Sequence, residues 1–313
     1  MLSIADIWQA RPVVMEAAIH TPLVRLQVED APGEIWLKLE NLQPIGSFKL
    51  RGAWNAMRRL PSESLANGVV AASAGNMAQG VAFAARSLGI PCTIIAPENA
   101  PAAKEAAVRR MGGEFIRIPR DAWWETFQRR TYPGLEDRVF VHAFDDDDVM
   151  AGNGTIALEI LEDLPNVDTI VAPFGGGGLA CGIAIGMRAL KPDVRVYAAE
   201  VDTAAPLSAS FAASERRTVD YQPSFVDGIG STMVFPRMWD MAQELLDASL
   251  VVSVAQAEEA VRLLAERQRI IAEGAAGCAV AAALAGRAGS GVTVCIVSGG
   301  NIDFSVLNRI LSA

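Results

Sequence analysis

The sequence predicts an α/β protein of two lobes, each built on a mostly parallel twisted sheet flanked by helices. Short β-branched runs alternate with alanine-rich helical stretches along the chain, which is typical of parallel sheets covered on both faces. The 313 residues exceed the usual size of one domain, and 51% of them are apolar while 20% are charged. We therefore expect two compact lobes that are folded throughout.

The stretch that starts at residue 69 predicts a small lobe. Residues 69–72 read as a buried strand, residues 76–88 as a helix that ends at Gly89, and residues 92–95 as the next strand, which makes one βαβ unit. The alternation continues through four more elements: a helix at 103–111, a strand at 114–118, a helix at 122–130 and a strand at 139–141. We place the small lobe at 68–145.

A second series predicts the large lobe, residues 1–67 plus 146–313. Its elements in order are a helix at 152–164, a strand at 169–172, a helix at 179–190, a strand at 194–199, helices near 257–267 and from residue 275, and a strand at 292–297. The acidic run from Asp145 to Asp148 predicts a solvated loop between the lobes.

The composition argues against several kinds of partner. A formal net charge of -9 and a pI near 4.9 offer no basic face to a nucleic acid. No segment has the pattern of a secretion signal or of a membrane-spanning helix, so we expect a cytoplasmic protein without a membrane partner. The cysteines lie far apart among apolar neighbours, and we interpret them as reduced, buried thiols: Cys92, Cys181, Cys278 and Cys295.

Lys49 is the first candidate for chemistry. It follows Gly46, Ser47 and Phe48, so small and aromatic neighbours can bury the amine, and Arg51 adds a second cation nearby. Burial and a neighbouring positive charge both lower a lysine pKa and favour the neutral, nucleophilic amine. Because a lysine taken alone is most often an ordinary surface residue, Lys49 gains significance only from the motifs that accompany it.

Four consecutive glycines, Gly175, Gly176, Gly177 and Gly178, follow a predicted strand and precede a predicted helix. Such a loop directs backbone N–H groups and the positive end of a helix dipole toward an anion. The spacing does not match G-x-G-x-x-G, and no acidic ribose reader follows about 20 residues on, so a phosphate is favoured over a dinucleotide. A tight turn without a ligand is the alternative.

Two further strand-to-helix junctions carry polar residues. Their sequences are Ser73-Ala74-Gly75-Asn76-Met77 and Ser298-Gly299-Gly300-Asn301. Backbone N–H groups at the first junction can hold a substrate carboxylate, with helix capping by Ser73 or Asn76 as the alternative. Because the carboxyl ends of parallel strands converge on one crevice, we expect both junctions to lie at one site.

Together these motifs predict a site for pyridoxal phosphate. Lys49 supplies an amine for a Schiff base with the cofactor aldehyde, the glycine run supplies phosphate donors, and Asn76 supplies an amide that orients the ring. The sequence argues against two other kinds of active site. His20 and His142 lack the spacing of metal ligands, and the G-x-S-x-G elbow of a serine hydrolase does not occur.

The chain resembles the fold type II (tryptophan synthase β-like) pyridoxal-phosphate enzymes. Within them it is most similar to the serine/threonine dehydratase and serine racemase group, and nearest to the threonine dehydratase catalytic domain. The similarity extends over nearly the whole chain. Besides the motifs above, it rests on four segments: His20-Thr21-Pro22-Leu23, Leu37-Lys38-Leu39-Glu40-Asn41, Gly152-Asn153-Gly154-Thr155 and Asp227-Gly228.

This resemblance implies a role for each candidate. Lys49 holds the cofactor, the glycines 175–178 bind its phosphate, Asn76 contacts the ring hydroxyl, and Phe48 packs against the ring. Ser298 faces the pyridine nitrogen, and a neutral hydroxyl there favours prompt loss of a β-substituent. The large lobe binds the cofactor, the small mobile lobe lies on the substrate side, and the protein is a homodimer.

The implied reaction is the dehydration and deamination of a β-hydroxy-α-amino acid. The Lys49 amine removes the Cα proton, the β-hydroxyl leaves with a proton from the cofactor phosphate, and hydrolysis gives a 2-oxo acid and ammonia. Residues 73–77 hold the substrate carboxylate. Racemisation or β-replacement on the same fold is the alternative, and a binding protein without turnover is a further one.

Several positions depart from the group's pattern. Ala74 stands where racemases have a serine as second acid/base, which argues against racemisation. Met77 replaces a histidine, and Gly274 replaces the proline that usually follows Glu273. Both changes suggest a substrate other than plain serine or threonine.

Two more features bear on the site. Glu200 matches one residue of the group's metal loop, but Pro206 stands at the expected aspartate, so Glu200 is only a weak metal candidate. Trp123 and Trp124 are predicted mainly as core of the small lobe, with a place at the border of the site as the alternative. In that alternative, one of them and Met77 make room for a bulkier, more apolar substrate such as phenylserine.

Overall fold

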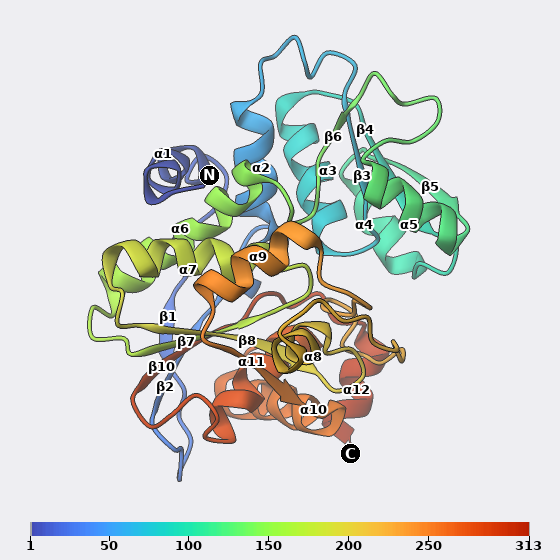
Figure 1. Ribbon diagram of the computed structural model, residues 1–313. Coiled ribbons are helices and arrows are strands. Elements are labelled where there is room, and N and C mark those ends of the chain that lie inside the picture. The colour runs from blue at the N-terminus through green and yellow to red at the C-terminus, as the bar shows by residue number, and fades with distance from the viewer. Residues whose placement is uncertain (1, 313) are drawn as a thin grey trace.

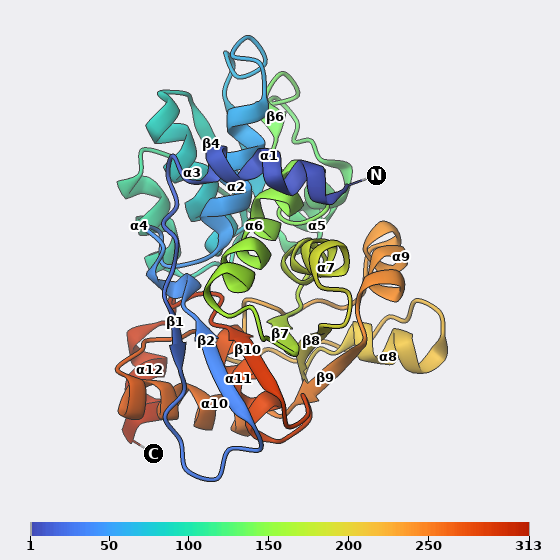
Figure 2. The same cartoon turned by 90° about the vertical axis from the view of Figure 1, so that its left-hand side faces the viewer.

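The computed structural model describes residues 2–312 and contains two sheets (Figure 1). The larger sheet has the strand order β1-β2-β10-β7-β8-β9, and all neighbours are parallel except β1 and β2 (Figure 2). Its strands are β1 (Leu23–Arg25), β2 (Glu34–Lys38), β7 (Thr169–Pro173), β8 (Arg195–Val201), β9 (Ala248–Val252) and β10 (Val292–Ile296).

The smaller sheet is entirely parallel and has the order β5-β4-β3-β6. Its strands are β3 (Val69–Ala72), β4 (Cys92–Pro97), β5 (Glu114–Ile118) and β6 (Val139–Phe140). All four lie within residues 68–145, the range that we expect for the small lobe, while the boundaries of that lobe stay a prediction. The two-sheet α/β architecture confirms the predicted fold class.

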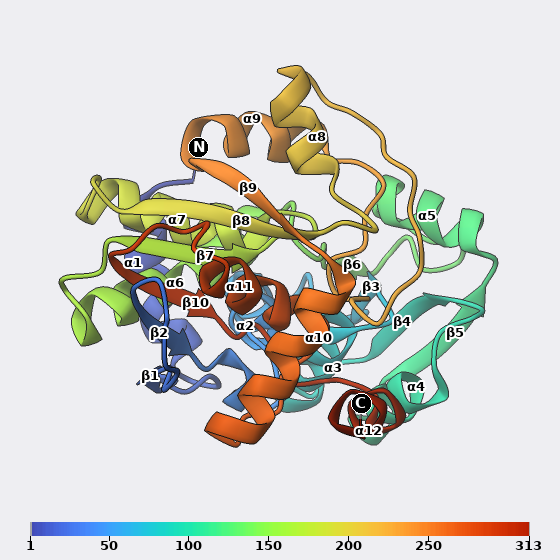
Figure 3. The ribbon, with the colours of Figure 1, turned by 90° about the horizontal axis from the view of Figure 1, so that it is seen from below.

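Helices cover both faces of the large sheet. Figure 3 shows α10 and α11 on the lower face, while α6, α7 and α9 lie on the opposite one (Figure 1). The helices are α1 (Ile4–Val14), α2 (Lys49–Arg59), α3 (Asn76–Leu88), α4 (Ala102–Arg110), α5 (Arg120–Arg129), α6 (Asp147–Asp163), α7 (Gly178–Leu190), α8 (Pro206–Ala213), α9 (Pro236–Leu245), α10 (Val254–Leu263), α11 (Gly274–Leu284) and α12 (Phe304–Ser312), with a 3₁₀ turn η1 (Glu40–Leu42) and a π-helical turn η2 (Leu264–Gln268).

Strand β7 shows why these strands read as continuous apolar runs. Ile170 and Ala172 pack with residues of α6 and α7, whereas Val171 packs with residues of α11 on the other face. Successive side chains of a strand point to opposite faces, so a strand covered on both sides needs an apolar residue at every position. In residues 2–312, none of the helices is long and apolar enough to cross a membrane.

The acidic run 145–148 is not the solvated loop that we expected. Helix α6 begins within it, because the Asp146 carboxylate accepts a hydrogen bond from the Val149 amide and caps the helix. Asp145 is buried and pairs with Arg237 at 3.2 Å. Carboxylates are favourable at a helix N-terminus, and a loop prediction from local charge misses both this effect and the distant arginine.

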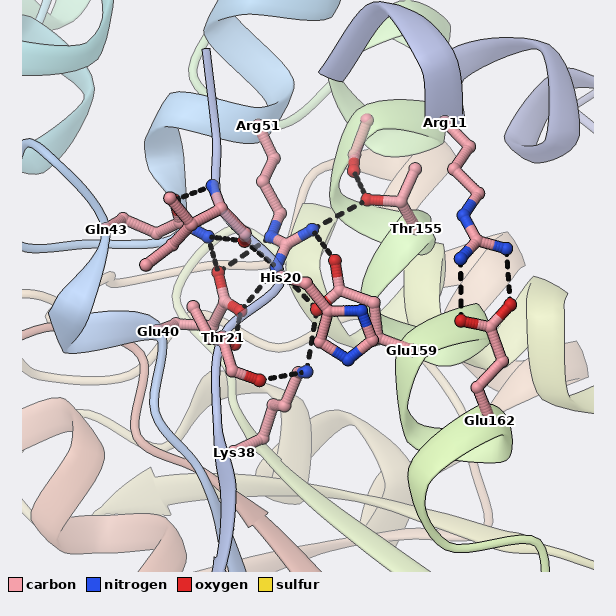
Figure 4. A network of polar contacts seen from close by, with 12 residues as sticks. Arg11, His20, Thr21, Lys38, Glu40, Gln43, Arg51, Thr155, Glu159 and Glu162 are labelled. Carbon is pink, nitrogen blue, oxygen red and sulfur yellow. Dashed lines mark hydrogen bonds and ion pairs between the residues drawn. The ribbon is translucent and has the colours of Figure 1, made fainter. Parts of the chain in front are cut away.

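A buried network of charges joins α2 to the rest of the large lobe (Figure 4). The Arg51 guanidinium donates two hydrogen bonds to Glu40, both at 2.8 Å, and two more to Glu159, at 2.6 and 2.9 Å. Lys38 lies 2.6 Å from Glu159 and donates to the Thr21 carbonyl at 2.7 Å. Two cations and two carboxylates therefore balance each other in an interior closed to water.

Removing one partner of this network should leave buried charge uncompensated. We expect Arg51→Met to lower the free energy of unfolding by about 3–5 kcal/mol. Urea denaturation followed by circular dichroism measures the loss. The control is Glu162→Gln, which breaks the exposed pair between Glu162 and Arg11 and should cost about 1 kcal/mol or less. Equal losses in the two variants would show that the network does not stabilise the fold.

Candidate active site

A cavity of about 440 Å³ lies between the two sheets, at the carboxyl ends of β3, β7 and β10. Every cofactor and substrate residue that the sequence predicts lines it: Phe48, Lys49, Ser73, Ala74, Gly75, Asn76, Met77, Gly175, Gly176, Gly177, Gly178 and Ser298. The parallel arrangement produces this convergence, because strands that run the same way end at the same edge.

Lys49 is the first residue of α2 and points into the cavity. Its Nζ donates a hydrogen bond to the Ala143 carbonyl at 2.6 Å and lies 5.0 Å from the centre of the Phe48 ring. Burial lowers the pKa of Lys49 to about 8, although the Glu273 carboxyl opposes this shift. The prediction that Arg51 contributes was wrong, since Glu40 and Glu159 hold its guanidinium in the network beneath α2.

His142 organises the turn that meets the lysine. Its Nδ1 accepts hydrogen bonds from the amides of Phe144 and Asp145, at 3.4 and 2.9 Å. Burial lowers the His142 pKa to about 3, and the charges of Arg130 and Lys49 add to the effect. The ring is therefore neutral at physiological pH and holds the Ala143 carbonyl toward Lys49. Sequence reasoning missed this role because an isolated histidine shows no pattern.

The glycine loop follows β7 and leads into the first turn of α7. Within the described chain, the N–H groups of Gly175, Gly176 and Gly177 have no protein acceptor, so they are available to an anion at a helix N-terminus. A Cβ on Gly176 would come within 1.9 Å of the Phe144 ring, and Gly177 has a φ of +94°. The loop is thus both a tight turn and a set of unpaired N–H donors of the kind that a phosphate requires.

The junction after β3 provides a second set of donors. Helix α3 begins at Asn76 with Gly75 as its N-cap and no side-chain cap, so the alternative of capping by Ser73 or Asn76 was wrong. The Ser73 hydroxyl instead accepts from the Gly75 amide at 3.2 Å. First-turn amides of α3 therefore stay available to a carboxylate. Met77 is buried and makes this wall apolar.

A chain of hydrogen bonds runs along the wall that includes Ser298. Asn76 donates to both oxygens of Glu273, at 2.9 and 3.1 Å, and the Ser298 hydroxyl donates to the same carboxyl at 3.3 Å. Asn301 donates to the Asn76 side-chain oxygen at 2.8 Å. Burial raises the pKa of Glu273, which favours its neutral acid. Glu273 thus sets the orientation of two predicted cofactor residues, while their contacts with a cofactor stay predictions.

The glycine after Glu273 has a packing explanation. A Cβ on Gly274 would lie 2.9 Å from both the Val226 Cα and the Phe225 ring. The loop that carries these two residues occupies the space a larger residue would need. The departure from the group's glutamate–proline pair therefore goes together with a closely packed neighbouring loop.

Glu200 accepts hydrogen bonds from the first turn of helix α8. Its carboxylate accepts hydrogen bonds from the amides of Leu207 and Ser208, at 2.9 and 2.7 Å, and from the Ser249 hydroxyl at 2.6 Å. Burial raises its pKa. In the part of the chain that the structure describes, no three His, Cys, Asp or Glu side chains gather as a metal site would require. The four cysteines are buried and unpaired, as predicted.

Trp123 and Trp124 both line the cavity, so the prediction that they serve mainly as lobe core was incomplete. Trp123 does pack against the small-lobe core around Val70 and Ile95. Three phenylalanines line the same wall: Phe127, Phe144 and Phe235. The cavity therefore has a polar end at the backbone loops and an aromatic side.

The two-lobed fold and this cavity define an α/β enzyme of the pyridoxal-phosphate class. The chain belongs to the family of pyridoxal-phosphate dependent enzymes, whose model matches residues 14–299. The residues fit the cofactor: Lys49 is a partly buried amine that faces the cavity and suits its aldehyde, and the glycine loop has unpaired N–H donors for its phosphate. The predicted family, fold and cofactor are confirmed.

Several known proteins are similar to this chain over most of their length. The L-threonine ammonia-lyase of Thermotoga maritima is 38% identical, covering 100% of this chain and 79% of the relative. A catabolic L-threonine dehydratase of Staphylococcus aureus is 35% identical, with coverage of 99% and 92%. Among solved structures, maize serine racemase has a TM-score of 0.90 at 31% identity, covering 99% of this chain and 97% of that one. The processed form of threonine deaminase isoform 2 from Solanum lycopersicum has a TM-score of 0.88 at 30% identity, with coverage of 98% and 86%.

The pKa of Lys49 predicts how the rate of cofactor loading depends on pH. Only the neutral amine attacks an aldehyde, so the loading rate should rise with pH and reach half its maximum near pH 8. Stopped-flow absorbance after mixing protein freed of cofactor with pyridoxal phosphate measures this rate. A midpoint near pH 10 would mean that the amine behaves as an exposed lysine.

The glycine loop predicts a steric effect on cofactor affinity. Gly176→Ala forces the Phe144 ring to move, and we expect the dissociation constant for pyridoxal phosphate to rise about tenfold or more. Gly75→Ala is the matched control, since no atom lies within 4 Å of its added Cβ. Equilibrium titration by absorbance compares the two, and equal affinities would contradict the close packing of the loop.

Proposed function

We propose that the protein is a pyridoxal-phosphate dependent ammonia-lyase. It converts a threonine- or serine-like β-hydroxy-α-amino acid to a 2-oxo acid and ammonia. The observation that carries this proposal is a partly buried lysine amine, with a pKa of about 8, in one cavity with two sets of unpaired backbone donors. An L-threonine ammonia-lyase at 38% identity and a catabolic L-threonine dehydratase at 35%, both over nearly the whole chain, support the same reaction.

The chain's own residues divide the work. When bound, pyridoxal phosphate withdraws electrons from the Cα of the amino acid and so makes its proton acidic. The neutral Lys49 amine accepts that proton. The glycine loop holds the phosphate, and the amides of residues 73–77 hold the substrate carboxylate. Ser298 offers the ring nitrogen a neutral hydroxyl, whose position Glu273 sets.

Dehydration is favoured over racemisation by one position. Serine racemases are close structural relatives, so the fold alone does not separate the two reactions. The residue that the resemblance assigns to the second acid/base is Ala74, whose methyl group cannot transfer a proton. A racemase needs a proton donor on each face of Cα, whereas an elimination needs only one base there.

We further propose that the protein acts as a homodimer in the cytoplasm. The buried, unpaired thiols support a reducing compartment. The dimer follows from the family resemblance, and size-exclusion chromatography with light scattering measures the mass directly against the 33.2 kDa of one chain.

The test is release of 2-oxo acid and ammonia by the purified protein loaded with cofactor. We expect equimolar release from at least one L-β-hydroxy-α-amino acid, and a loss of at least about 10³-fold in kcat for Lys49→Ala. Chiral analysis of unreacted serine serves as the control for racemisation. Formation of D-serine faster than pyruvate, or full activity of Lys49→Ala, would refute the proposal.

A further inference from the structure

We propose that the cavity selects a β-hydroxy-α-amino acid whose Cβ carries an aryl or similarly large apolar group, as in phenylserine. This inference rests on the proposed function and names its substrate class. The observation behind it is a wall of five aromatic rings, contributed by both lobes, in the cavity that holds Lys49: Trp123, Trp124, Phe127, Phe144 and Phe235.

The rings form one continuous cluster. Phe127 stacks on Trp124 with centroids 5.7 Å apart and an interplanar angle of 11°, and on Trp123 at 5.8 Å. Trp124 meets Phe235 edge to face at 5.9 Å, and Phe235 meets Phe144 at 5.2 Å. Offset stacked and edge-to-face pairs are the favoured arrangements of aromatic rings, so the cluster presents a preorganised surface.

The exposure of these side chains indicates where a ligand contacts them. Phe127 is buried and acts as the base on which the tryptophans lie. Trp123 and Trp124 are only half-buried, and both line the cavity. The accessible part of each indole is surface that a phenyl ring can cover more fully than the methyl group of threonine can.

The neighbouring wall is apolar too. Met77 is 2% exposed and lines the same cavity where the group usually has a histidine. A thioether packs against aromatic groups and offers only a weak acceptor, so it does not anchor a small polar side chain. Both walls therefore favour burial of an apolar substituent.

The alternative is a substrate whose Cβ carries a charged group in place of an aryl group. Lys104 at the cavity rim pairs with Asp227 at 2.5 Å, which neutralises it. Arg120 lies over the Tyr221 ring at 5.3 Å and has no carboxylate partner among the described residues. A second carboxylate, as in 3-hydroxyaspartate, would suit this arginine. Arg120 is exposed to water, however, whereas the aromatic rings are at least half-buried, so the aryl substrate is favoured.

The first test compares substrates. We expect kcat/KM for L-threo-phenylserine to exceed that for L-threonine by at least about tenfold, measured as 2-oxo acid release from the loaded enzyme. Threonine at equal or higher kcat/KM would overturn the inference while leaving the lyase in place. The highest kcat/KM for 3-hydroxyaspartate would also overturn it, because Arg120 would then set the specificity.

A binding measurement separates this inference from the proposed function. L-phenylalanine and L-alanine lack a β-hydroxyl, so they bind without elimination and report on the side-chain wall alone. We expect L-phenylalanine to bind at least about tenfold more tightly, with quenching of tryptophan fluorescence. If no β-hydroxy amino acid turns over but this preference holds, the proposed function fails and only the selectivity of the wall for an aryl side chain stands. Without the preference, the inference fails whether or not the lyase activity is found.

A variant tests whether Trp124 causes the preference for an aryl substrate. Trp124→Ala should lower the ratio of kcat/KM for phenylserine to that for threonine by at least about tenfold, and Trp124→Phe should retain most of it. Trp8→Ala is the matched control, since Trp8 is 47% exposed on α1 and is not among the residues that line the cavity. Equal ratios in Trp124→Ala and Trp8→Ala would show that the aromatic wall does not contact the substrate.

Discussion

The four-charge network of Lys38, Glu40, Arg51 and Glu159 is the interaction on which the site depends. It ties the end of β2, the turn η1 and α6 to α2, whose first residue is Lys49. Arg51 fixes α2 two residues after Lys49, so the Lys49 side chain has little freedom to change its direction. Burying four charges is costly, and the complete pairing seen here is the condition under which such a cluster is stable. The reactive amine is therefore positioned by groups that do not line the cavity.

The same pairing determines the electrostatics above it. Arg51 lies close to Lys49 in the chain, but its charge is balanced by two carboxylates, so burial is left as the cause that lowers the lysine pKa. Two nearby titratable groups have pKa values shifted toward their neutral forms. His142 has a pKa of about 3, and burial raises the pKa of Glu273. Among the charged residues that line the cavity, Lys104 pairs with Asp227 and Arg120 is exposed to water, so the backbone loops contribute much of the field that a phosphate and a carboxylate would meet.

Local patterns predicted the fold and the convergence of the candidate residues on one cavity, and most of what they missed was long-range. The glycine run, residues 73–77 and Ser298 follow strands, and parallel strands bring their ends together, so the pattern alone predicts one cavity. The sequence did not reveal that Glu273 organises the wall that includes Ser298, because its partner Asn76 is 197 residues away in the chain. The aromatic wall likewise depends on contacts between distant segments, such as the one between Trp124 and Phe235. The start of α6 at residue 147 is different, because it rests on a local cap from Asp146 that the charge pattern alone did not indicate.

The choice of basic residues has a consequence for chemical selectivity. Only four of the 27 basic residues are lysines, and the rest are arginines. Lys38 is paired with Glu159, Lys104 with Asp227, and Lys191 donates to the Pro165 carbonyl. Arginine stays protonated and does not condense with aldehydes as an amine does. With so few lysines, of which Lys38, Lys104 and Lys191 are engaged elsewhere, a free aldehyde meets few amines that compete with Lys49, and the background of adducts elsewhere on the molecule is lowered.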